Sequence, residues 1–394
     1  MCNGCFSIRR KHFARVRCAT LAFISLFFAS LAAIASGMDQ VTIEEKGTRR
    51  QIEGKIVTEA VNGQLLLLAT DGRFWMLEPD QVLERTTNEA PFTPVKREAL
   101  EKMLLQEFPG FKIHKTTNYL ICYNTSPAYA QWCGGLFERL HRGFQNFWSR
   151  KRFPVHTSEL PLVAILYDGR ESFQKHVHEE IGEASQSYLG YYSPTSNRVH
   201  LLDLTGVEEL KRGERTGARK RMSEVLARPE ALPQIATIVH EATHQLAYNC
   251  GVQTRFADNP AWVSEGLAMY FETPDLKSTS GWTSIGLVSA NRLQQMRQYQ
   301  PTRPVDSLET LIRDEQRFHT TKDIALDAYA EAWALNHFLF TKHQAEYIAY
   351  LQKLAEKPSG EQGTPETRLE EFKAAFGDLQ KLDTDFLRYI ATLP

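Results

Sequence analysis

The sequence predicts an α+β protein in which a small all-β part precedes a mixed region of strands and helices and then a helical C-terminal part. Three observations support this order. Asn-Gly and Asp-Gly dipeptides separate short apolar runs before residue 80, strand and helix patterns alternate after residue 112, and the pattern from residue 234 onward is almost entirely helical. The 394 residues are 42% hydrophobic and 24% charged, a globular composition that excludes collagen-like, disordered and multi-span membrane proteins.

The N-terminus has the organisation of an export signal. Five basic residues and no acidic residue precede Thr20, and the chain from there to Ala35 is apolar or small and uncharged. The small-x-small pattern ending at Ala35 predicts cleavage there, so that residues 1–35 are a signal peptide and the mature protein is periplasmic or extracellular. The alternative is an uncleaved anchor that tethers the protein to the membrane. A membrane-spanning helix needs about 17–25 apolar residues, and the uncharged run from Thr20 to Ala35 falls just short of that. After cleavage of the signal, no stable membrane span is expected.

The charge balance argues against a nucleic-acid partner. The chain has 46 basic and 47 acidic residues. Because five of the basic residues leave with the signal, the mature chain is mildly acidic. A basic run from Lys211 to Arg221 would support nucleic-acid binding as an alternative. Glu214 interrupts this run and further glutamates flank it, and such mixed charge is typical of a solvated helix or loop.

Residues 39–85 predict a small β domain. Asn62-Gly63 and Asp71-Gly72 favour the tight turns of β-hairpins, so we expect a five-stranded, SH3-like barrel. It would serve as a structural or docking module or, alternatively, as a pro-segment that covers an active site. We expect residues 86–111 to be a linker and residues 112–394 to form the second domain.

The second domain is expected to begin with strands at 119–123 and 160–167 and with two strands inside 188–204. A long helix is expected at 128–148 and a shorter one at 171–179. Cys122 and Cys133 have two interpretations: they form a disulfide in an oxidising compartment, leaving Cys250 unpaired, or all three are buried as small apolar side chains.

A helix predicted over residues 234–249 carries the sequence His240-Glu241-Ala242-Thr243-His244. Histidines four residues apart lie on one helix face, so both imidazoles can point at one metal ion while Glu241 flanks it. Neutral imidazoles suit Zn²⁺, whose catalytic sites use three protein ligands and keep a fourth position for water. A third ligand is therefore required.

The next predicted helix, which begins at Asn259-Pro260, supplies a candidate. It carries Glu265, far enough beyond His244 for a loop and a returning helix to bring its carboxylate to the metal. Glu272, two turns later on the same face, is the competitor. Its place near the helix end predicts a surface carboxylate instead.

The pattern His240-Glu241-x-x-His244 followed by Trp262-x-x-Glu265-Gly266-x-Ala268-x-Tyr270 resembles the gluzincin metallopeptidases. It is most similar to their peptidase-MA-like branch, which includes the aminopeptidase and thermolysin families, and to a group of secreted bacterial proteins that share this catalytic core. The resemblance implies a zincin-like core: a mixed sheet, then two zinc-site helices and a helical C-terminal part. It also implies His240, His244 and Glu265 as zinc ligands and Glu241 as the catalytic carboxylate.

The same resemblance implies a role for Tyr329. Residues 327–334 are similar to a helix on which related aminopeptidases carry an oxyanion-stabilising tyrosine; a packed aromatic beside Trp333 is the alternative. The chain also departs from the family. The segment with which aminopeptidases bind a free amino terminus has no counterpart at residues 190–198, and Met269 stands where thermolysin-like enzymes have a histidine-orienting aspartate.

These residues predict a zinc-dependent hydrolase that acts on the peptide bonds of a peptide or protein substrate. Zinc would activate a water molecule, Glu241 would accept its proton and deliver it to the leaving amine, and Tyr329 would donate to the oxyanion. The alternative is a non-catalytic envelope protein in which zinc serves the scaffold and the β domain binds a partner. Specificity, endo- versus exopeptidase action and oligomeric state do not follow from the sequence.

Overall fold

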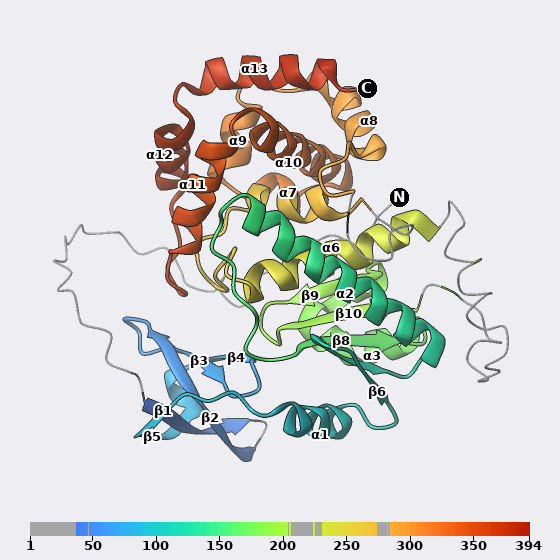
Figure 1. Ribbon diagram of the computed structural model, residues 1–394. Helices are drawn as coiled ribbons and strands as arrows, with labels where there is room; N and C mark the ends of the chain where they lie inside the picture. The colour runs from blue at the N-terminus through green and yellow to red at the C-terminus, as the bar shows by residue number, and fades with distance from the viewer. Residues whose placement is uncertain are drawn as a thin grey trace.

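The computed structural model describes residues 37–45, 47–203, 205, 224, 231–273, 282 and 284–394. They form an N-terminal antiparallel sheet, a central mixed sheet and a helical C-terminal part, in that order along the chain. Figure 1 shows the N-terminal sheet at the lower left and the C-terminal helices at the top. The predicted α+β class is therefore confirmed. The predicted export signal, residues 1–35, and the charged run 211–221 lie outside the described residues.

The N-terminal sheet has the strand order β4-β3-β2-β1-β5, with every neighbouring pair antiparallel. Its turns confirm two predicted hairpins, because Gly63 and Gly72 adopt φ values of 83° and 85° that favour glycine. The strands are β1 (Gly37–Glu45), β2 (Thr48–Glu59), β3 (Leu65–Ala69), β4 (Phe74–Leu77) and β5 (Val82–Pro91).

The sheet does not close into the predicted barrel. β4 and β5 stand at opposite edges, and the described pairings of β5 are all with β1. A barrel strand needs a row of apolar side chains that faces the interior. β5 lacks such a row, since Val82 is partly buried and the rest of the strand is exposed. The strand therefore extends the sheet instead of folding over its core.

The segment predicted as a linker, residues 86–111, contains structure of its own. It includes the second half of β5 and helix α1 (Arg97–Glu107), which buries Leu100 and Leu104. Arg97 at the start of α1 donates hydrogen bonds to the carbonyl oxygens of Thr116 and Tyr119 at 2.5 and 2.7 Å. These contacts attach α1 to the central sheet.

The central sheet has the order β6-β7-β8-β10-β9. β7, β8 and β10 are parallel, and the edge strands β6 and β9 are antiparallel to their neighbours. The strands are β6 (Lys112–Lys115), β7 (Tyr119–Tyr123), β8 (Leu162–Tyr167), β9 (Gly190–Ser193) and β10 (Arg198–Leu202). The predicted strands are confirmed. The two strands expected inside 188–204 are the edge strand β9 and its neighbour β10, and a turn that contains Pro194 separates them.

Each face of this sheet has its own core. Helix α2 (Pro127–Arg150) and the C-terminal helices pack on one face, and α1 and helix α3 (Arg170–Ile181) pack on the other. Side chains alternate between the two faces along each strand. Cys122 therefore belongs to one core and Cys133 of α2 to the other, and both are free thiols. No Cys122–Cys133 bridge forms, and Cys250 is also free and buried.

The C-terminal part consists of helices arranged around α10. This helix is buried along most of its length and contacts α7, α8, α11 and α13. The helices are α6 (Leu232–Asn249), α7 (Ala261–Phe271), α8 (Ala290–Tyr299), α9 (Ser307–Arg313), α10 (Lys322–Lys342), α11 (Gln344–Ala355), α12 (Pro365–Phe376) and α13 (Leu379–Thr392). Within the described ranges, none of the helices has the length and apolarity that crossing a membrane requires.

The N-terminal sheet docks beside the turn between β9 and β10. The Phe74 N–H donates to the carbonyl oxygen of Thr195 at 2.8 Å, and its ring packs edge-on against Phe256. The Arg255 guanidinium lies 4.4 Å from the centre of the Phe74 ring and donates to the carbonyl oxygens of Gly72 and Pro194. Residues 255 and 256 follow α6, so the two sheets meet next to the helix that carries the histidine motif.

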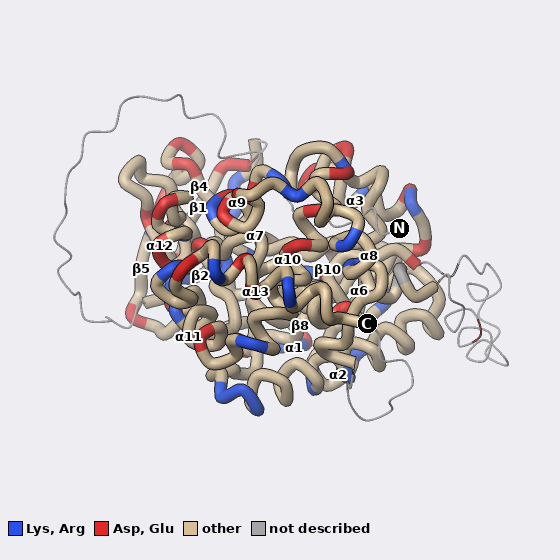
Figure 2. The backbone as a smooth tube through the Cα atoms, turned by 90° about the horizontal axis from the view of Figure 1, so that it is seen from above, with Lys and Arg blue, Asp and Glu red and all other residues tan. Residues whose placement is uncertain are grey.

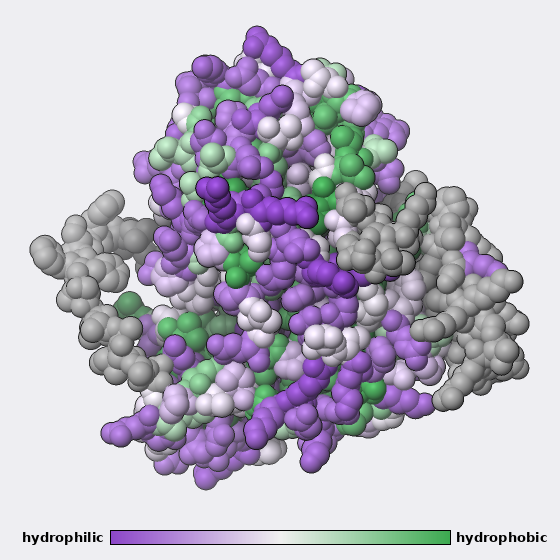
Figure 3. Space-filling view, viewed as in Figure 1, coloured by the Kyte–Doolittle hydropathy of each residue, from purple (hydrophilic) through white to green (hydrophobic). Residues whose placement is uncertain are grey.

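The described surface is of mixed charge. Figure 2 shows Lys and Arg interspersed with Asp and Glu over the helices that face the viewer. Figure 3 views the molecule as in Figure 1. The face that it shows is mostly hydrophilic, and apolar side chains form small separate areas on it. Scattered apolar side chains of this kind are normal for a protein surface.

Candidate metal centre

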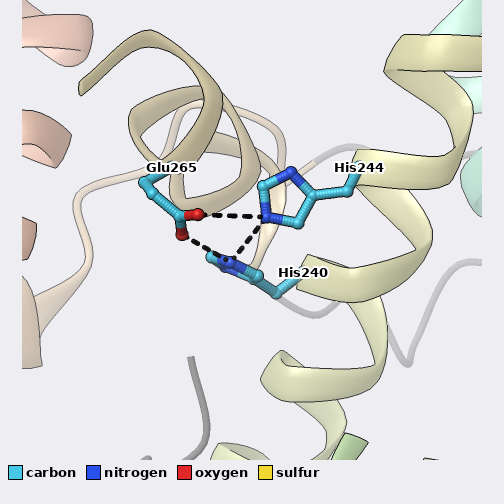
Figure 4. Close-up of side chains that lie close together, drawn as sticks. All are labelled: His240, His244 and Glu265. Carbon is cyan, nitrogen blue, oxygen red and sulfur yellow. Dashed lines mark hydrogen bonds and ion pairs between the residues drawn. The ribbon is translucent and has the colours of Figure 1, made fainter. Parts of the chain in front are cut away.

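Helix α6 presents the two motif histidines from one face. His240 is 1% exposed, and His244, one turn later, is partly buried. The helix ends where Gly251 adopts a φ of 84°, a conformation that favours glycine and lets the chain turn back. Figure 4 shows both imidazoles projecting from α6 toward the neighbouring helix.

That neighbouring helix, α7, supplies Glu265. The Gln253 side chain in the connecting loop donates to Ser264 Oγ at 2.7 Å, and the Asn259 side chain donates to the carbonyl oxygens of Thr254 and Ala257. These bonds shape the turn before α7. Glu265 is buried and directed at the two histidines (Figure 4).

The three side chains converge closely enough to hold one metal ion. Their ligating atoms all lie within 4.8 Å of one another. His240 Nε2 lies 3.1 Å from His244 Nε2 and 3.2 Å from Glu265 Oε2, while His244 Nε2 lies 3.7 Å from Glu265 Oε1. Ligands of a tetrahedral zinc ion, at about 2.0–2.2 Å from the metal, lie about 3.3–3.6 Å apart. Both the spacing and the two-imidazole, one-carboxylate composition therefore fit Zn²⁺.

Electrostatics favour the ionised form of Glu265. Burial by itself raises the pKa of a carboxyl group, but His244 and His240 outweigh burial and hold the pKa of Glu265 well below its usual range. This direction favours the carboxylate form of Glu265, the form that binds metal ions.

Glu241 follows His240 on α6 and is buried, and its carboxyl group interacts electrostatically with His240, His244 and Glu265. The Tyr192 main-chain N–H donates to Glu241 Oε2 at 2.8 Å. Burial raises the pKa of Glu241 above its usual range, although His240 and His244 act in the opposite direction. Tyr192 belongs to β9, so the edge strand of the central sheet runs next to this carboxylate.

Glu272 is not the surface carboxylate that the sequence predicts. It is 8% exposed, and its Oε2 lies 3.3 Å from His240 Nδ1. Arg292 Nε lies 3.1 Å from Glu272 Oε1. The prediction was wrong because α8 covers the end of α7 and brings a guanidinium to the carboxylate. Burial raises the pKa of Glu272, but Arg292 and His240 lower it further, and the net shift is downward.

Tyr329 lies on α10, which packs against α7. Its side chain is 4% exposed, and its ring packs edge-on against Phe318 with ring centres 5.1 Å apart. This contact agrees with the alternative of a packed aromatic, and Trp333 belongs to the same buried core. A role for the Tyr329 hydroxyl toward an oxyanion stays a prediction.

Sequence reasoning missed Arg292 and the Tyr192 N–H. Neither has a signal in the sequence, because one lies on a separate helix and the other is a main-chain group. Glu272 did have a signal: it follows Glu265 by seven residues, and two helical turns place both carboxylates on one face of α7.

Comparison with protein families places part of the chain in one of them. Residues 234–360 match a family described as Protein of unknown function (DUF1570). The matched region runs from α6 to α11 and contains the complete His240, His244 and Glu265 group, together with Glu272 and Tyr329. It covers less than half of the chain and includes neither sheet. No curated protein matches the chain.

Proposed function

We propose that this chain is an exported zinc metallopeptidase of the gluzincin type. One observation carries the proposal: two imidazoles of α6 and a carboxylate of α7 converge at zinc-ligand spacing, and Glu241 is buried directly beside them. An enzyme of this kind needs three protein ligands and a separate carboxylate that moves protons. All four side chains come from two adjacent helices.

His240, His244 and Glu265 would hold the ion. A bound zinc ion supplies Lewis acidity, which polarises a carbonyl group and lowers the pKa of water to about 7. Glu241 would accept a proton from the attacking water and pass it to the nitrogen of the leaving amine. The raised pKa of Glu241 suits this exchange, because a general base works best when its pKa approaches the working pH. The Tyr329 hydroxyl would donate a hydrogen bond to the developing oxyanion.

The edge strand supports a peptide as the substrate. Among the described residues, β10 is the strand that pairs with β9, and on the other side of β9 the Tyr192 N–H donates to Glu241. Extended peptides add to open sheet edges through main-chain hydrogen bonds. A peptide that lay along β9 would therefore pass close to Glu241.

A non-catalytic zinc scaffold is the alternative. Such a protein needs the three ligands but has no use for a buried carboxylate next to them, and burying a carboxylate costs free energy. The bond from Tyr192 to Glu241 favours the enzyme, because it orients a group that the scaffold does not require.

The decisive experiment replaces Glu241 with Gln. We expect the parent protein to cleave a mixed peptide library and E241Q to lose at least about 10²-fold in rate while keeping its zinc, since general acid–base catalysis contributes about 10²–10⁴-fold. Glu138→Gln is the matched control, because Glu138 also accepts a main-chain N–H, from Asn118, but lies on α2. Equal activity of E241Q and the parent would contradict the mechanism.

Metal analysis tests the ligand set independently of activity. The purified parent should contain close to one equivalent of zinc at neutral pH, and His240→Ala should contain almost none. A folded parent that retained less than about a tenth of an equivalent would argue against the three ligands.

A further inference from the structure

The two nitrogens of His240 face different partners. Nε2 faces His244 and Glu265, and Nδ1 faces Glu272 Oε2 at 3.3 Å. Glu265 lies on α7 and Glu272 directly follows its last residue, two turns later, so one helix and its C-terminal cap place a carboxylate at each nitrogen of the same ring. An imidazole that donates from Nδ1 keeps its lone pair at Nε2, where a metal ion can bind it.

Arg292 of α8 fixes the carboxylate of Glu272 through both oxygens. Its Nε lies 3.1 Å from Oε1 and its Nη2 lies 3.4 Å from Oε2. Side chains of this pair are 14% and 11% exposed, so little water competes for the contact. A bidentate ion pair of this kind restricts the rotation of a carboxylate more than a single hydrogen bond does.

The position of α8 is itself fixed from the other side. Gln295, one turn after Arg292, donates to Asp327 Oδ1 of α10 at 2.7 Å. Helix α8 therefore connects α10 to the end of α7. A displacement of α8 would be transmitted through Arg292 and Glu272 to the ring of His240.

We propose that Glu272 and Arg292 are positioning residues for the metal centre: Glu272 accepts the Nδ1 proton of His240, and Arg292 holds Glu272 in that orientation. This inference rests on the metal site of the proposed function. It assigns Glu272 to the outer nitrogen of His240 rather than to the ion, because Glu265 and His244, and not Glu272, face Nε2. Removing such an outer partner typically costs 10–100-fold in metal affinity.

The test measures zinc affinity by competition with a chromophoric chelator at constant pH, using the protein without its signal segment. We expect Glu272→Met, which removes the acceptor at similar volume, to bind one zinc 10–100-fold more weakly than the parent. Glu272→Gln should lose less, because its amide oxygen still accepts from Nδ1. Arg292→Lys should weaken binding several-fold, because lysine lacks the planar fork that grips both oxygens.

Asp383→Asn is the matched control. Asp383 also pairs through both oxygens with an arginine, Arg303, but contacts no histidine of the site. The zinc affinity of D383N should equal that of the parent even if the unfolding temperature of the variant falls. If E272M does not fold, E272Q and R292K carry the test.

The outcomes separate the two proposals. Parent-like affinity in E272M, or in both E272Q and R292K, would overturn the positioning role while leaving the metal site intact. Complete loss of zinc stoichiometry in folded E272Q would make Glu272 a direct ligand and would also overturn the inference. A folded parent that binds no zinc would overturn the proposed function itself.

Discussion

Gly266 of α7 lies directly against the side chain of Asn336 of α10. A Cβ atom at this glycine would overlap Asn336 Nδ2 and would lie 2.8 Å from the carbonyl oxygen of Ala332. Asn336 in turn donates to the carbonyl oxygens of Trp262 and Ala332 and accepts from the hydroxyl of Tyr347. Because Gly266 follows Glu265, this close approach of two helices determines where the third candidate ligand stands.

Gly266→Ala should therefore destabilise the protein and weaken zinc binding. Overpacking of a buried position costs about 1–3 kcal/mol, and here backbone as well as the Asn336 side chain would have to move. Gly135→Ala on α2 is the control, because a Cβ there meets nothing within 4 Å and alanine favours the helix. Chemical denaturation and zinc titration of both variants test the contrast. Equal stability of G266A and G135A would contradict the packing argument.

Tyr329→Phe should lower kcat for peptide hydrolysis with little change in KM. Loss of one oxyanion donor costs about 10²–10³-fold in kcat. Tyr350→Phe serves as the control, since Tyr350 is also buried, its ring packs on Trp262, and none of the described residues forms a hydrogen bond with its hydroxyl. Steady-state kinetics on one peptide substrate decide the matter: if both variants match the parent, Tyr329 is a packed aromatic.

Asp258→Asn should remove part of the stability that the protein has at neutral pH. Burial raises the pKa of Asp258, but Arg368 and Lys357 outweigh burial and hold it below its usual value. A depressed folded pKa means that the pair stabilises the protein above the unfolded-state pKa of about 3.9 and ceases to do so as the pH falls through the lower folded value. Breaking a buried pair costs about 3–5 kcal/mol.

Unfolding free energies from pH 7 down to pH 3 test this prediction. The difference between the parent and D258N should be largest at neutral pH and should shrink in acid. Asp385→Asn, at an exposed pair with Arg388, should change stability little at any pH. A constant difference between D258N and the parent across the range would contradict the linkage.

Arg255→Ala should loosen the contact between the N-terminal sheet and the turn after β9. The substitution removes the guanidinium from the Phe74 ring and its bonds to the carbonyl oxygens of Gly72 and Pro194. Amide hydrogen exchange at residues 72–74 and 193–197 should become faster. Arg50→Ala is the control, because Arg50 lies over Trp75 within the N-terminal sheet itself. Unchanged exchange in R255A would show that other contacts hold the sheet in place.

Local patterns account for the parts of the fold that were predicted. The Asn-Gly and Asp-Gly turns, the strands β7 to β10 and the motif helix α6 each depend on residues close together in the chain. The predictions that were wrong depend on distant contacts. Closure of the N-terminal sheet required an apolar row that β5 lacks, and the exposure of Glu272 depended on α8, which begins well after α7 ends. The Cys122–Cys133 alternative failed because Cys122 of β7 points to one face of the central sheet and α2, which carries Cys133, packs on the other.

The sequence by itself determined how the motif residues stand on their own helix. Helical periodicity alone places His240 and His244 on one face of the helix and Glu241 beside that face. Only the tertiary structure decided that Glu265 completes the group and that Glu272 holds the outer nitrogen of His240. The positions of both glutamates depend on the packing of α7 against α10 at Gly266 and on the contact with Arg292 of α8. Contacts between separate helices cannot be predicted from the hydrophobic periodicity of either helix.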